Sequence, residues 1–263
     1  NTNSFFILKD GNSVTDQSGQ GNNYSVGGGT LSDLEDCPSN VFNTMSNLNK
    51  SSSVDVRRNA NTTVGISNSS SGAARSNWNI PATGKWYFEY KMIPDNQGNT
   101  YPNSGIKYDA EKFYNPDHSN SDADIFVYGT YGSILLYVRN GTNITANAPA
   151  SSGDIFGFAI DQDNGAIYVH ENGTYMTQGG NVGNPTSGGS KTGAVFTYTA
   201  GTYPNMCLVG KEFGNSETQW NFGNGIFFTT PVSSAGNNPS NVGIFEYDCP
   251  TGYTALSTKG LNL

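Results

Sequence analysis

Charge is scarce in this chain. Charged residues make up 13% of its 263 residues, with 13 Lys and Arg against 21 Asp and Glu, whereas an average globular protein has roughly 25%. The net charge is −8 and no basic run occurs. Nucleic acids and anionic membrane surfaces are bound through several Lys or Arg contacts to phosphates, so the composition argues against both as partners.

Long hydrophobic runs are also missing. The longest apolar run near the start covers residues 5–8, far short of a membrane span, and no signal-peptide pattern is present. The first residue is Asn rather than Met. We therefore expect a protein without membrane insertion that is either processed or a piece of a longer chain.

Cysteine and histidine are too few for most metal and nucleophile chemistry. Cys37, Cys207 and Cys249 lie far apart with no C-x-x-C spacing, so neither a zinc site nor a redox motif is predicted. Buried free thiols are the favoured interpretation, and one bridge between Cys37 and Cys249 is the alternative. The only histidines are His118 and His170. His170 ends a predicted strand, where we expect an exposed or half-buried position.

Hydrolase signatures are absent as well. No Ser-His-Asp grouping and no G-x-S-x-G motif can be identified. A glycosidase needs two carboxylates roughly 5–10 Å apart, but no E-x-D-x-x-E run occurs, Glu89 lacks a partner at that spacing, and a glycine-containing loop separates Glu212 from Glu217. We therefore predict a protein that is not an enzyme and uses no cofactor.

The chain is instead rich in residues that form turns and sheets. Asn and Gly together make about a quarter of it, and aromatic residues reach 12%, while helix formers are sparse. Residues 153–173 (GDIFGFAIDQDNGAIYVHENG) are the clearest case. Two apolar runs flank Asp163-Asn164-Gly165, and the second ends at Asn172-Gly173. Asn-Gly favours a tight hairpin turn, so this stretch predicts three short antiparallel strands.

Similar signals recur along the chain. Strands are predicted near residues 5–8, 24–26, 54–56, 63–66, 85–93, 125–128, 133–138, 194–199, 206–209 and 218–222. No helix over about 10 residues is predicted. Short strands at close spacing indicate an all-β, antiparallel two-sheet sandwich or a barrel. Residues 94–124 and 178–193 lack periodicity, and long irregular loops are often functional.

Three motifs, in order, resemble a SPRY domain. They are residues 84–89 (GKWYFE), residues 153–161 continuing to the Asn-Gly pairs at 164–165 and 172–173, and residues 220–223 (WNFG) followed by Phe227. The resemblance covers about residues 84–228. It implies a concanavalin-like, jelly-roll-type β-sandwich, with 1–83 as an N-terminal extension and 229–263 as a closing segment, all in one compact unit.

The flanks resemble virion proteins of tailed bacteriophages. Residues 16–23 (DQSGQGNN) and 36–40 (DCPSN) look like the start of such proteins, and residues 246–261 are similar to their P-x-G-[YF]-x-A-L-x-T-x-N-L ending, with Gly260 in place of Asn. This resemblance implies a tail fibre, spike or capsid-surface appendage, assembled in the bacterial cytoplasm. The partners it implies are other virion proteins, a host-surface glycan or protein, and copies of itself by analogy with phage fibres.

Candidate ligand contacts lie in and near the first irregular loop. Tyrosine offers a large amphipathic surface at low entropic cost, which suits sugar rings and protein surfaces. The candidates are Tyr101, Tyr108, Tyr114, His118 and Tyr131, although packing of these rings onto their own sheet is the alternative.

Metal binding is not predicted. Asp117, Asp122 and Asp124 lack the D-x-D-x-D-G spacing of a calcium loop, and Asp161 and Asp163 are expected to serve a turn. Three functions remain open: a receptor-binding adhesin, a purely structural capsid decoration protein and a polysaccharide-degrading spike.

Overall fold

The computed structural model describes residues 2–7, 13–28, 36–37, 39–58, 60–66, 71–94, 104–109, 125–130, 133–138, 142–145 and 151–263. Within these ranges the only helical elements are the short 3-10 helices η2 (Pro185–Ser190) and η3 (Gly260–Asn262). No helix of the described segments is long and apolar enough to cross a membrane.

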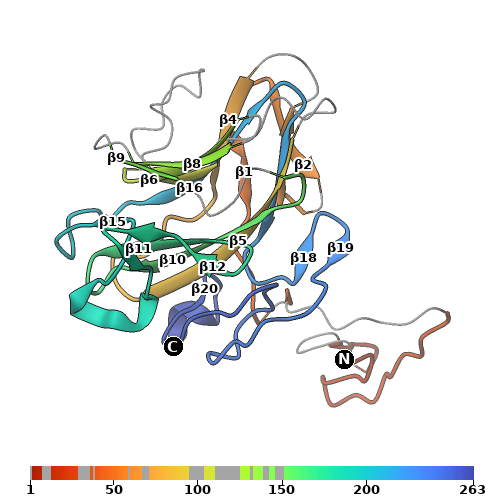
Figure 1. Ribbon diagram of the computed structural model, residues 1–263. Helices are drawn as coiled ribbons and strands as arrows, with labels where there is room; N and C mark the ends of the chain where they lie inside the picture. The colour runs from red at the N-terminus through yellow and green to blue at the C-terminus, as the bar shows by residue number, and fades with distance from the viewer. Residues whose placement is uncertain are drawn as a thin grey trace.

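Two sheets stacked face to face make up the body of the molecule (Figure 1). The first has the order β1 (Met45–Lys50), β4 (Ser71–Ser76), β16 (Cys207–Phe213), β6 (Gly105–Lys107), β7 (Ile125–Thr130), β8 (Ser133–Val138) and β9 (Thr142–Thr145). The second has the order β12 (Thr174–Tyr175), β11 (Ala166–Glu171), β10 (Ile155–Asp161), β5 (Lys85–Ile93), β17 (Glu217–Asn221), β3 (Thr63–Ile66) and β2 (Val54–Arg58). The predicted all-β antiparallel sandwich is confirmed.

Short elements complete the second sheet and the surface. β15 (Phe196–Thr197) pairs with β11, and β20 (Thr254–Ala255) pairs with β5 as a parallel exception among antiparallel neighbours. Two small hairpins lie outside the main sheets, β13 (Thr177–Gln178) with β14 (Asn181–Val182), and β18 (Ile226–Phe227) with β19 (Thr230–Pro231).

Aromatic side chains of β5, β10 and β17 form the centre of the core. Phe88 stacks on Phe158 with ring centroids 5.3 Å apart, and Tyr90 lies 5.0 Å from Trp220. The cross-strand register sets these contacts, because Phe88 pairs with Phe158 and Tyr90 pairs with Trp220. Neighbouring side chains in such pairs contact each other directly and stabilise the sheet.

The C-terminal segment covers the outer face of the second sheet. β17 pairs with β5 only from Glu89 onward. The edge of β5 that β17 leaves open before Glu89 is taken by β20, which pairs with Trp86 and Tyr87. Phe245 packs edge-on against Tyr87 at 4.8 Å. Strands covered on both faces do not need alternating polarity, which explains why every residue of β10 and β11 is buried.

The predicted hairpin stretch of residues 153–173 forms β10, β11 and β12, as expected. At the second turn, both Asn172 (φ 47°) and Gly173 (φ 83°) have positive φ, as a type I′ turn requires. The first turn is wider. Asp161 pairs with Ala166 across a loop of four residues, and Gly165 donates its N–H to the Asp161 carbonyl at 2.8 Å.

Two predictions near the N-terminus are wrong. Neither residues 5–7 nor residues 24–26 form strands. They are held by single contacts instead of a ladder, such as Gln17 N–H to the Phe6 carbonyl at 2.7 Å and Tyr24 N–H to the Val14 carbonyl at 3.1 Å. The described residues of 2–28 lie beside the sheets rather than in them (red to orange-red, Figure 1).

The segment expected to be an N-terminal extension contributes to both sheets. β1 and β4 belong to the first sheet, and β2 and β3 belong to the second. The sequence did not indicate β1 and β4, because β1 (MSNLNK) is an edge strand with three of its six residues exposed and β4 (SGAARS) has mainly small side chains. Their strand structure comes from pairing, since β16 supplies five partner residues to β4.

Candidate functional site

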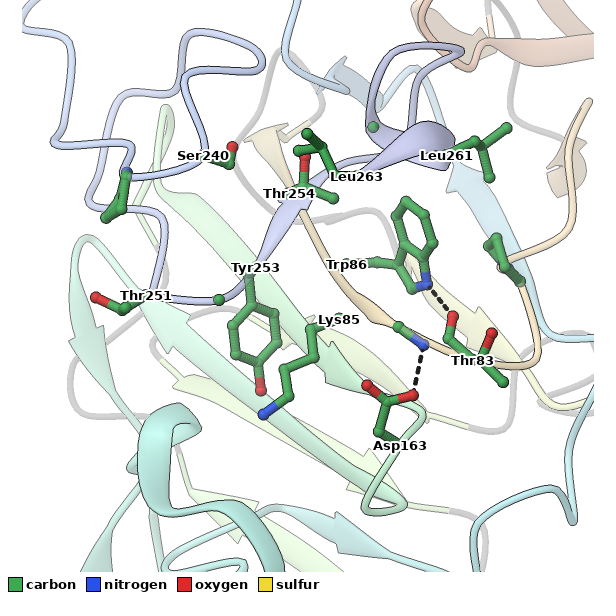
Figure 2. Close-up of a pocket in the computed structure, with 15 residues that line it drawn as sticks. Thr83, Lys85, Trp86, Asp163, Ser240, Thr251, Tyr253, Thr254, Leu261 and Leu263 are labelled. Carbon is green, nitrogen blue, oxygen red and sulfur yellow. Dashed lines mark hydrogen bonds between the residues drawn. The ribbon is translucent and has the colours of Figure 1, made fainter.

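A cavity of about 600 Å³ opens where the start of β5 meets the C-terminal segment (Figure 2). We call it the Lys85 cavity. Segments far apart in the chain surround it: the loop before β5 with the first residues of β5, the turn between β10 and β11, and the last 25 residues. The lining residues are Pro81, Thr83, Gly84, Lys85, Trp86, Asp163, Pro239, Ser240, Thr251, Gly252, Tyr253, Thr254, Gly260, Leu261 and Leu263.

A buried ion pair forms one side of the Lys85 cavity. Lys85 Nζ lies 3.0 Å from Asp161 Oδ2, with the lysine side chain 23% exposed and the aspartate fully buried. Asp161 also accepts hydrogen bonds from the Asn164 backbone N–H at 2.9 Å and its side-chain amide at 2.8 Å. Lys85 Nζ lies 5.6 Å from the centre of the Tyr253 ring, within cation–π range. Asp161 therefore holds the ammonium group of Lys85, a lining residue, next to the Tyr253 ring.

Asp163 is the one acidic side chain among the described lining residues. Its Oδ1 accepts the Gly84 N–H at 2.7 Å, which ties the β10–β11 turn to the loop before β5. The residue is exposed, and within the described chain its Oδ2 accepts no hydrogen bond. Asp161 and Asp163 thus have the turn role expected of them, and Asp163 also presents an open acceptor.

The remaining wall is aromatic and aliphatic, with hydroxyl groups around it. Trp86 Nε1 donates to the Thr83 carbonyl at 2.9 Å, and Tyr253 Oη donates to the Pro185 carbonyl at 3.1 Å. In Figure 2 the indole lies beneath Leu261, while the Lys85 side chain runs beside the Tyr253 ring. Mixed apolar and polar linings of this kind are typical of small-ligand sites.

A second cavity, of about 570 Å³, is lined by residues at the β11–β12 turn and by residues 234–237 and 246–248 of the C-terminal segment. Its walls include two carboxylates that the sequence did not single out, Glu246 and Asp248. Both Glu246 oxygens accept from Ser233, from its N–H at 2.7 Å and from its hydroxyl, and Asp248 Oδ1 accepts the Asn237 N–H at 2.7 Å. Both carboxylates therefore hold the loop of residues 233–237 in place.

The prediction of an exposed or half-buried His170 is wrong. The residue is 1% exposed, because the C-terminal segment covers this part of the sheet and Tyr247 packs edge-on against the imidazole at 5.3 Å. Burial lowers the pKa of His170 to about 3, so the ring is neutral. Its Nδ1 accepts the Gly173 N–H at 3.2 Å, which leaves the proton on Nε2, 2.6 Å from Tyr87 Oη.

The hydrogen-bond network that runs from His170 through Tyr87 ends at the carboxylate of Glu89. Tyr87 Oη donates to its Oε1 at 2.9 Å, and the N–H groups of Glu246 and Tyr247 donate to its two oxygens at 2.9 Å each. Burial raises the pKa of Glu89 to about 7, although these hydrogen bonds and a fourth from Asn221 act to lower it. The network thus attaches the C-terminal segment to the centre of β5.

Most of the ligand contacts predicted from sequence lie outside the described residues, namely Tyr101, Tyr114, His118 and Tyr131, as do Asp117, Asp122 and Asp124. Tyr108 is described and half-buried. Its ring stacks on Tyr203 at 4.5 Å and on Phe196 at 4.8 Å. Tyr108 is therefore packed within the protein, which is the alternative to ligand contact given for these tyrosines.

The second irregular loop contains the β13–β14 hairpin and η2. Ser187 lies 3.2 Å from Tyr168 Oη, and Pro185 accepts from Tyr253. η2 is therefore adjacent to the tyrosine that lines the Lys85 cavity (Figure 2). Sequence reasoning selected this loop but missed the cavity, whose lining residues are too distant in sequence to form a local motif.

The three cysteines are free thiols, with Cys207 and Cys249 buried and Cys37 half-buried. The expectation of free thiols is confirmed and the Cys37–Cys249 bridge is not formed, whereas the expected burial holds for Cys207 and Cys249 but not for Cys37. In the described ranges, no group of three or more His, Cys, Asp or Glu side chains is arranged to hold a metal ion.

No family model matches the chain, and no curated protein matches it either. Among solved structures, the chain is similar to the SPRY domain of human HERC1, with 14% identity, 67% of this chain and 96% of that domain covered, and a TM-score of 0.44.

Proposed function

We propose that this chain is a non-catalytic binding component on the surface of a tailed-bacteriophage particle, where it contacts the host surface or neighbouring virion proteins. The virion assignment is supported by the flanking motifs at residues 16–23 and 246–261. The Lys85 cavity carries the binding assignment. It combines an ammonium group, an open carboxylate oxygen and an apolar wall on a rigid sheet end, and such convergent polar groups in an apolar cleft mark ligand sites.

The placement of carboxylates favours binding over polysaccharide cleavage. A glycosidase needs two carboxyl groups able to reach the cleaved bond, roughly 5–10 Å apart. In the Lys85 cavity Asp161 is fully buried and paired, which leaves Asp163 as the accessible carboxylate. In the second cavity, Glu246 and Asp248 are engaged by the backbone of residues 233–237.

One observation favours the structural decoration role as a second candidate. Four apolar side chains of the N-terminal segment are exposed: Phe5 (51%), Phe6 (44%), Tyr24 (49%) and Val26 (47%). Phe5 and Tyr24 contact each other edge-on at 4.9 Å. Clustered exposed apolar groups often mark protein–protein contacts, so this segment suits attachment to a neighbouring virion protein.

The test of the proposed function has two parts. Peptides of this chain are sought by mass spectrometry in purified particles, and gold-labelled antibody locates it on them by electron microscopy. Purified, fluorescently labelled protein is then added to host cells. Surface labelling of the particle together with saturable cell binding is expected for an adhesin, and surface labelling without cell binding for a decoration protein. Absence from the particle would contradict the proposal.

Catalysis is tested separately. The purified protein is incubated with host polysaccharide, and new reducing ends are measured beside the Glu246→Gln and Asp248→Asn variants. We expect no release by any of the three proteins. Release by the wild type that is lost in either variant would establish the depolymerase instead.

A further inference from the structure

We propose that the Lys85 cavity binds one uncharged sugar unit of a surface glycan. This inference rests on the proposed binding function and specifies its ligand class. It differs from the sequence-based expectation, which placed recognition in the loops at 94–124 and 178–193.

The charges around the cavity favour an uncharged ligand over an anionic one. Lys85 contributes one positive charge, and its partner Asp161 cancels it at 3.0 Å. Asp163 is then the one charged side chain of the described lining without an opposite charge beside it, in a protein whose total side-chain charge is −8. A phosphate, sulfate or sialic acid entering this site would be repelled by the surrounding field, whereas an uncharged ligand is not penalised.

The hydrogen-bonding groups match a hydroxyl-rich ligand. An ammonium group has three protons, and Asp161 is the only acceptor described for those of Lys85. Asp163 Oδ2 is an open acceptor on another lining residue. A sugar hydroxyl both accepts and donates, so the hydroxyls of one ligand are suited to accept from Lys85 and to donate to Asp163. Bonds of this type to charged groups are stronger than those between neutral groups.

A buried hydroxyl in the cavity wall lacks a partner. Thr254 is 8% exposed, and its Oγ1 makes no hydrogen bond within the described chain. Buried polar atoms are almost always satisfied in folded proteins. An unsatisfied hydroxyl at the wall of a polar cavity therefore indicates a missing hydrogen-bonding partner, which a ligand or a bound water would supply.

The size and the apolar wall agree with a single sugar ring. Small-molecule sites have volumes of roughly 300–1,000 Å³, and the Lys85 cavity has about 600 Å³. Pro81, Trp86 and Leu261 contribute apolar surface opposite the charged side. A pyranose ring has the same division, with C–H faces on one side and hydroxyls at its edge.

The experiment uses the purified full chain and an array of uncharged oligosaccharides built from glucose, galactose, mannose and N-acetylglucosamine. Sialylated and sulfated versions and a library of unstructured peptides are included. Ligands that bind on the array are confirmed by saturation-transfer NMR. Thr251→Trp places a large ring at the exposed rim of the cavity, and Thr229→Trp is the matched control, because it makes the same change at another exposed turn, between β18 and β19.

A third variant tests the open carboxylate oxygen. Asp163→Asn keeps the Oδ1 acceptor for the Gly84 N–H but removes the charge that would bind the sugar hydroxyl. Loss of one hydrogen bond to a charged group corresponds to about a tenfold or greater weakening of binding. Melting temperatures of all variants are measured to show that each is folded.

The expected result is binding of an uncharged glycan that is at least tenfold weaker in Thr251→Trp and Asp163→Asn and unchanged in Thr229→Trp. Binding that survives Thr251→Trp would overturn the cavity assignment, and a preference for anionic glycans or peptides would overturn the ligand class. Absence of any glycan binding would also overturn this inference, whereas the proposed function is judged independently by particle labelling and host-cell binding.

Discussion

Replacing Gly157 with Ala tests the most tightly constrained contact of the second sheet. Gly157 lies in β10, with Glu89 of β5 opposite on one side and His170 of β11 on the other. A Cβ atom at this position would lie 1.9 Å from His170 Nε2 and 2.5 Å from its Cε1. The ring cannot simply rotate away, because it is 1% exposed and packed against three tyrosines.

The expected cost has two parts. Forcing extra volume into a packed core costs about 1–3 kcal/mol. Moving the imidazole also breaks its 2.6 Å contact with Tyr87 Oη, and a buried donor left unsatisfied costs about 1–3 kcal/mol. Together these predict a loss of roughly 2–6 kcal/mol in the free energy of unfolding, which for a chain of this size lowers the melting temperature by on the order of 10 °C.

Thermal unfolding followed by circular dichroism measures this effect in a double-mutant cycle. His170→Ala removes the ring that the new methyl group would meet, so Gly157→Ala is expected to cost less than about 1 kcal/mol in that background. Gly189→Ala is the matched control. Its Cβ would meet only Asn164 Oδ1, at an ordinary 3.8 Å, and surface substitutions of this kind change stability by about 0.5 kcal/mol or less.

Two outcomes would refute the reasoning. The first is a melting temperature of Gly157→Ala within about 2 °C of the wild type, which would show that the strand register or the ring position differs. The second is an equal cost of Gly157→Ala with and without His170, which would show that the glycine is needed for a reason other than the imidazole.

Three further effects are expected. Burial raises the pKa of Glu212 to about 8. Between about pH 4.5 and pH 8, the carboxyl group is therefore protonated in the native state and ionised in the unfolded chain. The free energy of unfolding should therefore fall as pH rises from about 4.5 to 8, and Glu212→Gln should flatten that slope in urea titrations, whereas an unchanged slope would contradict the assignment. In native protein, maleimide should label the half-buried Cys37 and leave Cys249 unmodified, since Cys249 is buried and burial raises its thiol pKa; mass spectrometry reads this out, and equal labelling of both would be inconsistent with the fold. Lys85→Met should lower the free energy of unfolding by about 3–5 kcal/mol because it leaves Asp161 buried without its cation, and a change below about 1 kcal/mol in urea titrations would speak against the ion pair.

Local chemistry explains which strands were predictable. β5 matches its predicted range of residues 85–93, because aromatic and β-branched side chains favour extended backbone whatever covers them. β11 and β12 follow from the Asn172-Gly173 turn, whose positive φ values are a property of those two residues. β1, β4 and β6 have no such signal, and their extended form depends on partners distant in the chain.

The candidate sites were much less accessible from sequence. Asp161 and Asp163 were identified as turn residues, which they are, but nothing in a linear motif relates them to Lys85, Ser240 or Thr254. No motif in the sequence relates His170 to Glu89. They are linked through Tyr87, because the β5–β10–β11 register places all three side chains beneath the C-terminal segment.

From its residues alone, this chain is predicted to be an acidic, antiparallel all-β protein in which free thiols are favoured over a disulfide and no helix exceeds about 10 residues. Those properties depend on composition, on the alternation of side chains and on the backbone preferences of Asn-Gly pairs, which act over a few residues. The Lys85 cavity and the network at Glu89 depend on the C-terminal segment, which returns to pair with β5 more than 160 residues away in sequence. Contacts of that range are set by the packing of the whole chain, so only the folded structure reveals them.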